Sequence, residues 1–188
     1  MIRILIPYGT VEGQTARIAE CLAHVIQDHG CEAHPVDIER AGAPNPASYD
    51  AVIVGASVHM GKHESSVRDF VRQHRQTLER LPSAFFSVSL AAHEDTPKAR
   101  QEVQRCIDRF LQETGWRPGT IGRFAGALLY TRYGFFTRWM MKQIARSKGS
   151  PDTDTSRDYF YTDWDSVKRF GTEFLEMLVP AVAVGARE

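Results

Sequence analysis

The 188-residue sequence has few cysteines, no excess of either charge and no long apolar run. Its three cysteines, Cys21, Cys31 and Cys106, are scattered without C-x-x-C spacing, which favours buried reduced thiols over disulfides. The 23 basic residues balance 23 acidic ones, so nothing in the net charge indicates a nucleic-acid partner. No apolar run approaches the ~18 residues of a membrane span, and the chain begins directly with a strand pattern. We therefore expect a cytoplasmic protein with one domain at 1–180 and a tail at 181–188.

Strand-like and helix-like segments alternate, which is typical of a parallel sheet covered by helices on both faces. Apolar runs predict five strands at 2–7, 33–37, 51–55, 84–90 and 124–130. Helical spacing follows the first, third and fourth strands and recurs near the C-terminus, whereas Pro44 and Pro46 leave little room for a regular second helix. Thr96 and either Thr162 or Asp163 are predicted N-caps. The pattern predicts an α/β flavodoxin-like fold, doubly wound, with strand order 2-1-3-4-5.

The segment between the first strand and the first helix has the composition of a phosphate-binding loop. Gly9 and Gly13 allow a sharp turn, and the helix that follows would direct its free N–H groups into the loop. The segment lacks the lysine of a Walker loop and the spacing of the dinucleotide fingerprint. An ordinary strand-to-helix turn with an N-cap fits the same residues. The predicted phosphate contacts are Thr10, Val11, Glu12, Gly13, Gln14 and Thr15.

Two more loops are expected at the same edge of the sheet. In a sheet of this order, ligands bind beyond the carboxyl ends of the strands where the order reverses, here between the first and third strands. Small residues at 56–61 would let the chain pass close to a flat ring, and small polar residues follow the fourth strand. This arrangement suits FMN, with its ring between the two loops. The predicted ring contacts are Ala56, Ser57, Val58, His59, Met60, Gly61, Ser87, Val88, Ser89 and Leu90.

A metal site is the alternative for this edge, because His59 and His63 are four residues apart. No carboxylate or cysteine completes a ligand set around them. The sequence therefore favours solvated or cofactor-edge histidines, and we expect no metal.

Residues 131–161 form an insertion that a five-stranded sheet does not need. Arg138, Lys142 and Arg146 would share one face of a helix over 133–146, with aromatic and methionine side chains opposite. A helix packed on the domain with its basic face in water fits this pattern, and so does a helix against a membrane surface or an anionic ligand. The predicted substrate or membrane contacts are Arg132, Tyr133, Arg138, Trp139, Lys142 and Arg146.

Nearly the whole sequence resembles the flavodoxin-type, quinone-dependent protoporphyrinogen dehydrogenases of bacterial haem synthesis. The resemblance is carried by the insertion and by segments in the same order, among them Gly13-Gln14-Thr15, Ile53-Val54-Gly55-Ala56-Ser57, Trp116-Arg117-Pro118, Asp152-Thr153-Asp154-Thr155 and Tyr161-Thr162-Asp163-Trp164. It implies bound FMN, oxidation of protoporphyrinogen IX to protoporphyrin IX by removal of six electrons, and menaquinone or ubiquinone as the acceptor. It also implies a peripheral place on the cytoplasmic face of the inner membrane. Because FMN carries the redox chemistry, no catalytic side chain is predicted.

Other functions stay open. An electron-carrying flavodoxin is usually strongly acidic, so the balanced charge and the basic insertion argue against that role. A quinone reductase fed by NAD(P)H, and a binding domain that has lost its cofactor, are further alternatives. The sequence also leaves open whether copies of the chain form a homo-oligomer.

Overall fold

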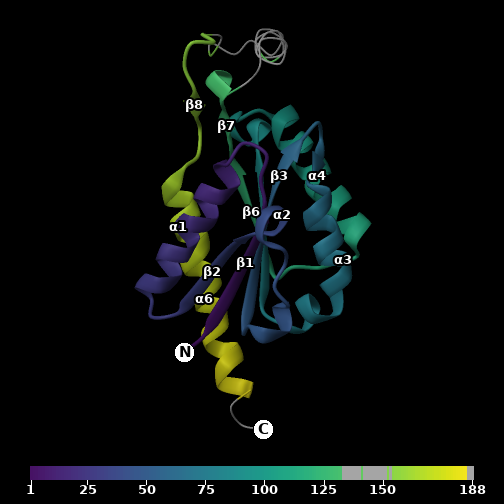
Figure 1. The fold of residues 1–188 in the computed structure, drawn as a ribbon, viewed down its shortest axis with the longest axis vertical. Helices are drawn as coiled ribbons and strands as arrows, with labels where there is room; N and C mark the ends of the chain where they lie inside the picture. The colour runs from purple at the N-terminus through teal and green to yellow at the C-terminus, as the bar shows by residue number, and fades with distance from the viewer. Residues whose placement is uncertain (133–140, 142–151, 153, 186–188) are drawn as a thin grey trace.

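A computed structural model describes residues 1–132, 141, 152 and 154–185 (Figure 1). Its centre is a sheet of five parallel strands in the order β2-β1-β3-β5-β6, and the short strand β4 pairs antiparallel with the end of β3. Counted along the chain, the five parallel strands have the order 2-1-3-4-5, so the predicted fold is confirmed. The strands are β1 (Arg3–Gly9), β2 (Glu32–Asp37), β3 (Ala51–His59), β4 (Lys62–His63), β5 (Ser83–Ser89) and β6 (Thr120–Ala125).

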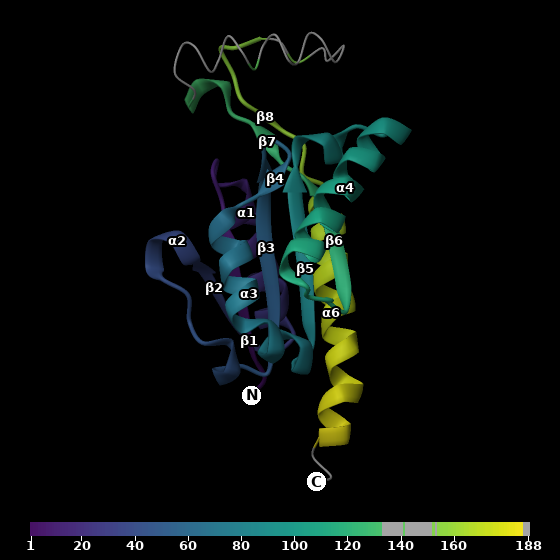
Figure 2. The ribbon, with the colours of Figure 1, turned by 90° about the vertical axis from the view of Figure 1, so that its right-hand side faces the viewer.

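Two pairs of helices cover the two faces of the sheet (Figures 1 and 2). Helices α1 (Gln14–Asp28) and α6 (Trp164–Gly185) pack with alternate strand residues such as Ile4, Ile6 and Phe86. Helices α3 (Ser65–Arg80) and α4 (Pro97–Thr114) pack with residues of the opposite alternation, such as Leu5 and Phe85. Because successive strand residues point to opposite faces, the sheet separates two hydrophobic cores.

Helix ends follow the predicted capping residues. Thr96 Oγ1 accepts a hydrogen bond from the N–H of Ala99 at 3.1 Å, and Gly115 ends α4 with a left-handed φ of 67°. Asp163, rather than Thr162, caps α6, since its Oδ1 accepts from the N–H of Asp165 at 3.1 Å. Between β2 and β3 the chain forms only the short helix α2 (Ile38–Ala41) and the 3₁₀ turn η1 (Pro46–Ser48), as the prolines predict.

The fifth strand differs from the prediction of residues 124–130. β6 begins at Thr120 and ends at Ala125, and after Gly126 the chain forms β7 (Ala127–Leu128), which pairs antiparallel with β8 (Tyr159–Phe160). The N–H of Gly126 still donates to the carbonyl of Ser89, the last residue of β5, at 3.1 Å. The apolar run thus spans two elements that are both buried, which periodicity does not separate. The β7–β8 ribbon forms the base of the insertion.

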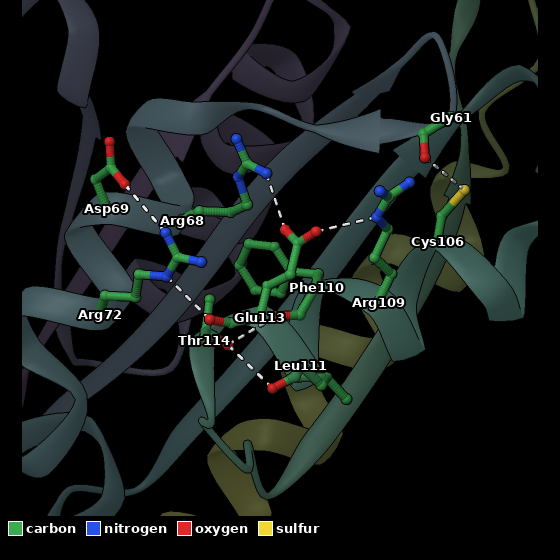
Figure 3. Close-up of polar contacts among 10 residues, drawn as sticks. All are labelled: Gly61, Arg68, Asp69, Arg72, Cys106, Arg109, Phe110, Leu111, Glu113 and Thr114. Atoms are coloured by element: carbon green, nitrogen blue, oxygen red, sulfur yellow. Dashed lines mark hydrogen bonds and ion pairs between the residues drawn. The ribbon is translucent and has the colours of Figure 1, made fainter.

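A polar cluster on the outer side of α3 and α4 joins these helices (Figure 3). The carboxylate of Glu113 accepts hydrogen bonds from Arg68 Nη1 at 2.8 Å and from Arg109 Nε at 3.0 Å. The carbonyl of Glu113 also accepts from Arg72 Nε at 2.9 Å. The hydrogen bonds from Arg68 and then Arg109 lower the pKa of the Glu113 carboxyl.

Several predictions concern segments of the insertion and the C-terminus. The predicted contacts Tyr133, Arg138, Trp139, Lys142 and Arg146 lie outside the described residues, as does the predicted helix over 133–146 apart from Met141. The backbone of Arg132 ends the 3₁₀ turn η3 (Tyr130–Arg132). Helix α6 continues through residues 181–185, which the sequence assigned to a tail. Within the described part of the chain, no helix has the length and apolar content to cross a membrane.

Candidate cofactor site at the carboxyl ends of the strands

The loop between β1 and α1 has an open helix N-terminus. Gly13 precedes α1 with a φ of 89°, and no side chain caps the helix, so the first N–H groups of α1 face the loop. Thr10 Oγ1 instead accepts from the N–H of Gly13 at 2.9 Å and closes the turn. A Cβ atom on Gly9 would lie only 2.7 Å from Val67 Cγ2, so this glycine lets α3 approach the end of β1. These features suit an anion held by backbone groups.

The side chains at the start of α1 differ in whether they are available to hydrogen-bond a ligand. Thr15 is 1% exposed, and among the described residues its Oγ1 has no hydrogen-bond partner. A buried hydroxyl without a partner is costly unless a ligand satisfies it. Gln14 Nε2, by contrast, donates to Thr162 Oγ1 at 2.8 Å, so the Gln14 side chain already has a protein partner. Glu12 is half-buried.

The loop predicted to begin at residue 56 is a β-hairpin. Residues 56–59 continue β3, and Val58 and His59 pair with His63 and Lys62 of β4. Met60 and Gly61 form the turn at φ values of 49° and 75°, as a two-residue hairpin requires. The sequence pattern did not predict that β3 continues through residues 56–59, because polar residues interrupt the apolar run there. On the α4 side, Cys106 Sγ lies 3.6 Å from the carbonyl oxygen of Gly61 and donates to it (Figure 3).

His63 is a core residue rather than a solvated or cofactor-edge histidine. Its side chain is 4% exposed, its ring meets Phe85 and Phe110 edge-on, and Nε2 lies 2.8 Å from Ser87 Oγ. Burial lowers the pKa of His63 to about 4, so the ring is neutral at physiological pH. His59 is exposed. The described residues contain no group of three metal-binding side chains.

The end of β5 brings further predicted ring contacts to the same edge. The Ser89 side chain is buried, with 8% of its surface exposed, and within the described ranges its Oγ has no hydrogen-bond partner. Ser87 faces His63, while Val88 packs in the core beneath α1 and α6. Ala56 is likewise buried in the core beneath α3 and α4. Val88 and Ala56 can therefore meet a ligand only through their backbone atoms.

Two groups near this edge were not predicted from the sequence as site residues. Glu64 precedes α3 and accepts a hydrogen bond from Ser57 Oγ at 3.2 Å; burial raises the pKa of its carboxyl. His93, at the end of the 3₁₀ turn η2 (Leu90–His93), stacks on the Tyr161 ring with centroids 3.9 Å apart. In the sequence, Glu64 and His93 are each a single polar residue beside a loop, and such residues are too common to indicate a binding site.

The segment that follows β8 connects the start of α1 to the sheet. Thr162 Oγ1 accepts from Gln14 Nε2 and donates to the carbonyl of Ala125 at 2.7 Å. One residue before Tyr161, the ring of Phe160 lies beneath the Arg17 guanidinium at 5.2 Å. Figure 2 shows that β7 and β8 rise beyond the carboxyl ends of the parallel strands. The insertion therefore enters and leaves the domain beside the candidate cofactor site.

Comparison with known proteins defines the class of this chain. The family model for the flavodoxin domain matches residues 5–155. Oxidised flavodoxin 1 from Bacillus cereus has a similar fold, with a TM-score of 0.54 and 18% identity over 93% of this chain and 97% of that one. A flavodoxin from the domain Archaea gives a TM-score of 0.52 and 13% identity over 94% and 98% of the two chains. The fold and the family model thus make this a flavodoxin-domain protein.

Sequence identity to two named enzymes is higher than to these flavodoxins. The chain is 35% identical over 176 residues to protoporphyrinogen IX dehydrogenase (quinone) of Escherichia coli strain K12, covering 94% of this chain and 96% of that protein. It is 36% identical over 184 residues to the protein of the same name from Leishmania major, covering 95% and 78%. The chain therefore belongs to the quinone-dependent protoporphyrinogen IX dehydrogenase family. Its named relatives are oxidoreductases, and its flavodoxin domain implies a flavin cofactor.

Proposed function

We propose that this protein binds FMN and oxidises protoporphyrinogen IX to protoporphyrin IX, with a membrane quinone as electron acceptor. The observation that carries the proposal is the identity of 35% to a named dehydrogenase over 94% of the chain. This similarity extends beyond the flavodoxin-domain match at residue 155. A flavodoxin domain by itself would support only a flavin protein.

The residues at the sheet edge fit the FMN phosphate. The uncapped N-terminus of α1 offers N–H donors. Among the residues that the structure describes, the buried Thr15 hydroxyl has no hydrogen-bond partner, and a phosphate oxygen would supply one. The phosphate contacts we propose run from Thr10 to Thr15, with Gln14 contributing its backbone alone because its side chain is bound to Thr162.

The FMN ring is proposed to lie between the β3–β4 hairpin and the end of β5. The Ser89 hydroxyl supports this position, because it has no partner in the described part of the chain and a polar group of the cofactor would satisfy it. Ser57, His59, Met60, Gly61 and Leu90 complete the proposed ring contacts. When bound, FMN would supply the two-electron redox chemistry, and the chain would hold and shield it.

The overall reaction removes six electrons and six protons from each protoporphyrinogen. Three two-electron cycles would reduce three quinones to three quinols, each quinol taking two of the electrons and two protons. Menaquinone and ubiquinone are the proposed acceptors. No step requires a nucleophile from this chain, so we assign no catalytic side chain.

A lipid-soluble acceptor requires access to a membrane surface, so we propose peripheral contact on the cytoplasmic face of the inner membrane. The basic residues Arg138, Lys142 and Arg146 of the insertion support this contact. Replacing all three with glutamine should weaken binding to anionic lipid vesicles in a flotation assay and leave FMN binding unchanged. Equal flotation of the variant and the wild type would refute the assignment of this face to the membrane.

The proposed activity is tested by an anaerobic assay with purified FMN-loaded protein, protoporphyrinogen IX and a quinone. Formation of protoporphyrin, dependent on both protein and quinone, is the expected result. Flavin binding without porphyrinogen turnover would indicate an electron carrier. Quinone reduction at the expense of NADPH would indicate an NAD(P)H-dependent reductase, and a colourless protein that takes up no FMN would indicate a binding domain.

A further inference from the structure

A cavity of about 280 Å³ lies at the outer edge of β6, and we call it the edge cavity. It is bounded by η2, by β6, by the segment after β8 and by the first turn of α6. Its lining includes Ala92, His93, Arg123, Tyr161, Asp163 and Ser166. Leu90, a proposed FMN ring contact, belongs to the same 3₁₀ turn as Ala92 and His93. The edge cavity therefore adjoins the proposed cofactor site.

Arg123 gives the edge cavity a cation that is available to a ligand. Among the described residues it makes one hydrogen bond, from Nη2 to Gln104 Oε1 at 2.8 Å, and no ion pair. A guanidinium has five N–H donors in a planar arrangement that matches a carboxylate. Most of the donors of Arg123 thus have no protein partner in the described part of the chain.

Asp163 is the acidic residue in the cavity lining, and its oxygens are occupied. Oδ1 accepts from the N–H groups of Asp165 at 3.1 Å and Ser166 at 3.3 Å, while Oδ2 accepts from Ser166 Oγ. The hydrogen bonds from Ser166 lower the pKa of the Asp163 carboxyl. Asp163 therefore acts as the cap of α6, and its charge is partly balanced by the positive end of that helix.

One wall of the edge cavity is aromatic and tied in place. The rings of His93 and Tyr161 stack at 3.9 Å with an interplanar angle of 26°. Two residues earlier in the chain, the Tyr159 ring lies nearly parallel to the Tyr161 ring, with centroids 6.4 Å apart and an interplanar angle of 9°. The Tyr161 hydroxyl donates to Asp152 Oδ2 at 2.6 Å. A flat apolar surface beside an available guanidinium suits an aromatic ligand that carries a carboxylate.

We propose that the edge cavity binds a propionate side arm of the tetrapyrrole, with its carboxylate paired to Arg123 and a pyrrole ring against His93 and Tyr161. The inference rests on the proposed function. The volume of about 280 Å³ is below the range of pockets that enclose drug-sized molecules, so it accommodates a side arm and not the macrocycle. The macrocycle would then extend past η2 toward the proposed FMN ring.

The test compares Arg123→Gln with Arg105→Gln, an exposed arginine on α4 that bonds to Gln101 and does not line the cavity. The ligands are protoporphyrin IX and its dimethyl ester, in which both carboxylates are neutralised. Binding to each FMN-loaded protein is followed by fluorescence titration, and FMN content is measured on the same samples. Arg123→Gln should raise the Kd of the free acid about tenfold, the effect of one charge-assisted pair of about 1.4 kcal/mol. It should leave the Kd of the ester and the FMN content unchanged, and Arg105→Gln should change none of these.

An Arg123→Gln variant that binds the acid as tightly as the wild type overturns the assignment of this cavity. Equal weakening of acid and ester overturns it as well, since the effect would then be independent of the carboxylate. Neither result contradicts the proposed function if the wild-type protein oxidises protoporphyrinogen. A wild-type protein that neither binds the porphyrin nor oxidises the porphyrinogen would overturn both proposals.

Discussion

Acidification should destabilise the protein through His63. Burial lowers its pKa from the ordinary 6.5 to about 4, so the unfolded chain binds a proton more readily than the folded one between these values. The stability that depends on neutral His63 is therefore complete above pH 6.5 and is lost as the pH falls toward 4. At 1.36 kcal/mol for each pKa unit, the loss between pH 7 and pH 4.5 is about 2 kcal/mol.

The variant His63→Gln isolates this effect, because glutamine can still bond to Ser87 and does not titrate. At pH 7 the variant should be less stable by about 1–2 kcal/mol, since it loses the ring contacts with Phe85 and Phe110. As the pH falls to 4.5, the wild type should lose its advantage and the two free energies of unfolding should converge or cross.

Urea unfolding of the cofactor-free protein, followed by circular dichroism at several pH values from 7 to 4.5, provides the measurement. His24→Gln is the matched control, because His24 is exposed on α1 and its replacement should change stability by less than about 0.5 kcal/mol at every pH. A constant difference between wild type and His63→Gln across this range would refute the buried neutral state of His63.

Three further substitutions test other contacts. Thr15→Val should raise the Kd for FMN about tenfold in a fluorescence titration without destabilising the cofactor-free protein, because it removes a buried hydroxyl that has no described partner; a loss of stability with unchanged affinity would contradict this. Thr162→Val should lower the free energy of unfolding by about 1–2 kcal/mol in urea, since Gln14 loses its partner; wild-type stability would contradict it. Glu113→Gln should cost about 1 kcal/mol at pH 7, and this difference should vanish as the pH falls through the lowered pKa of Glu113, because the wild-type side chain is then uncharged like the glutamine of the variant; a pH-independent cost would contradict the charge-assisted bonds.

Much of the fold could be predicted because it depends on local patterns. Apolar runs mark the parallel strands, and the turn chemistry at Thr96 and Gly115 marks the ends of α4. The division of the run 124–130 into β6 and β7 could not be predicted, since both elements are buried and apolar. What separates them is the pairing of β7 with β8, more than thirty residues away in the sequence.

The candidate site was predictable in its backbone and less so in its side chains. The glycines and hydroxyls of the first loop indicated an anion site, and in the structure Gly13 has a positive φ and Thr15 is buried. The bond between Gln14 and Thr162 joins residues 148 positions apart, so only the folded chain reveals it. The sequence predicted His63 to be solvated or at the cofactor edge, yet the aromatic residues of β5 and α4 enclose it.

The most direct test of the proposed function is a stoichiometric measurement in the strict absence of oxygen. Protoporphyrinogen IX and excess quinone are mixed with the FMN-loaded protein, and protoporphyrin fluorescence and quinol absorbance are recorded together. Six electrons leave each porphyrinogen and each quinone takes two, so the account predicts three quinols for every protoporphyrin, formed only with the FMN-loaded protein. Porphyrin formation no faster than in the protein-free control, or quinol formation without porphyrin, would contradict it.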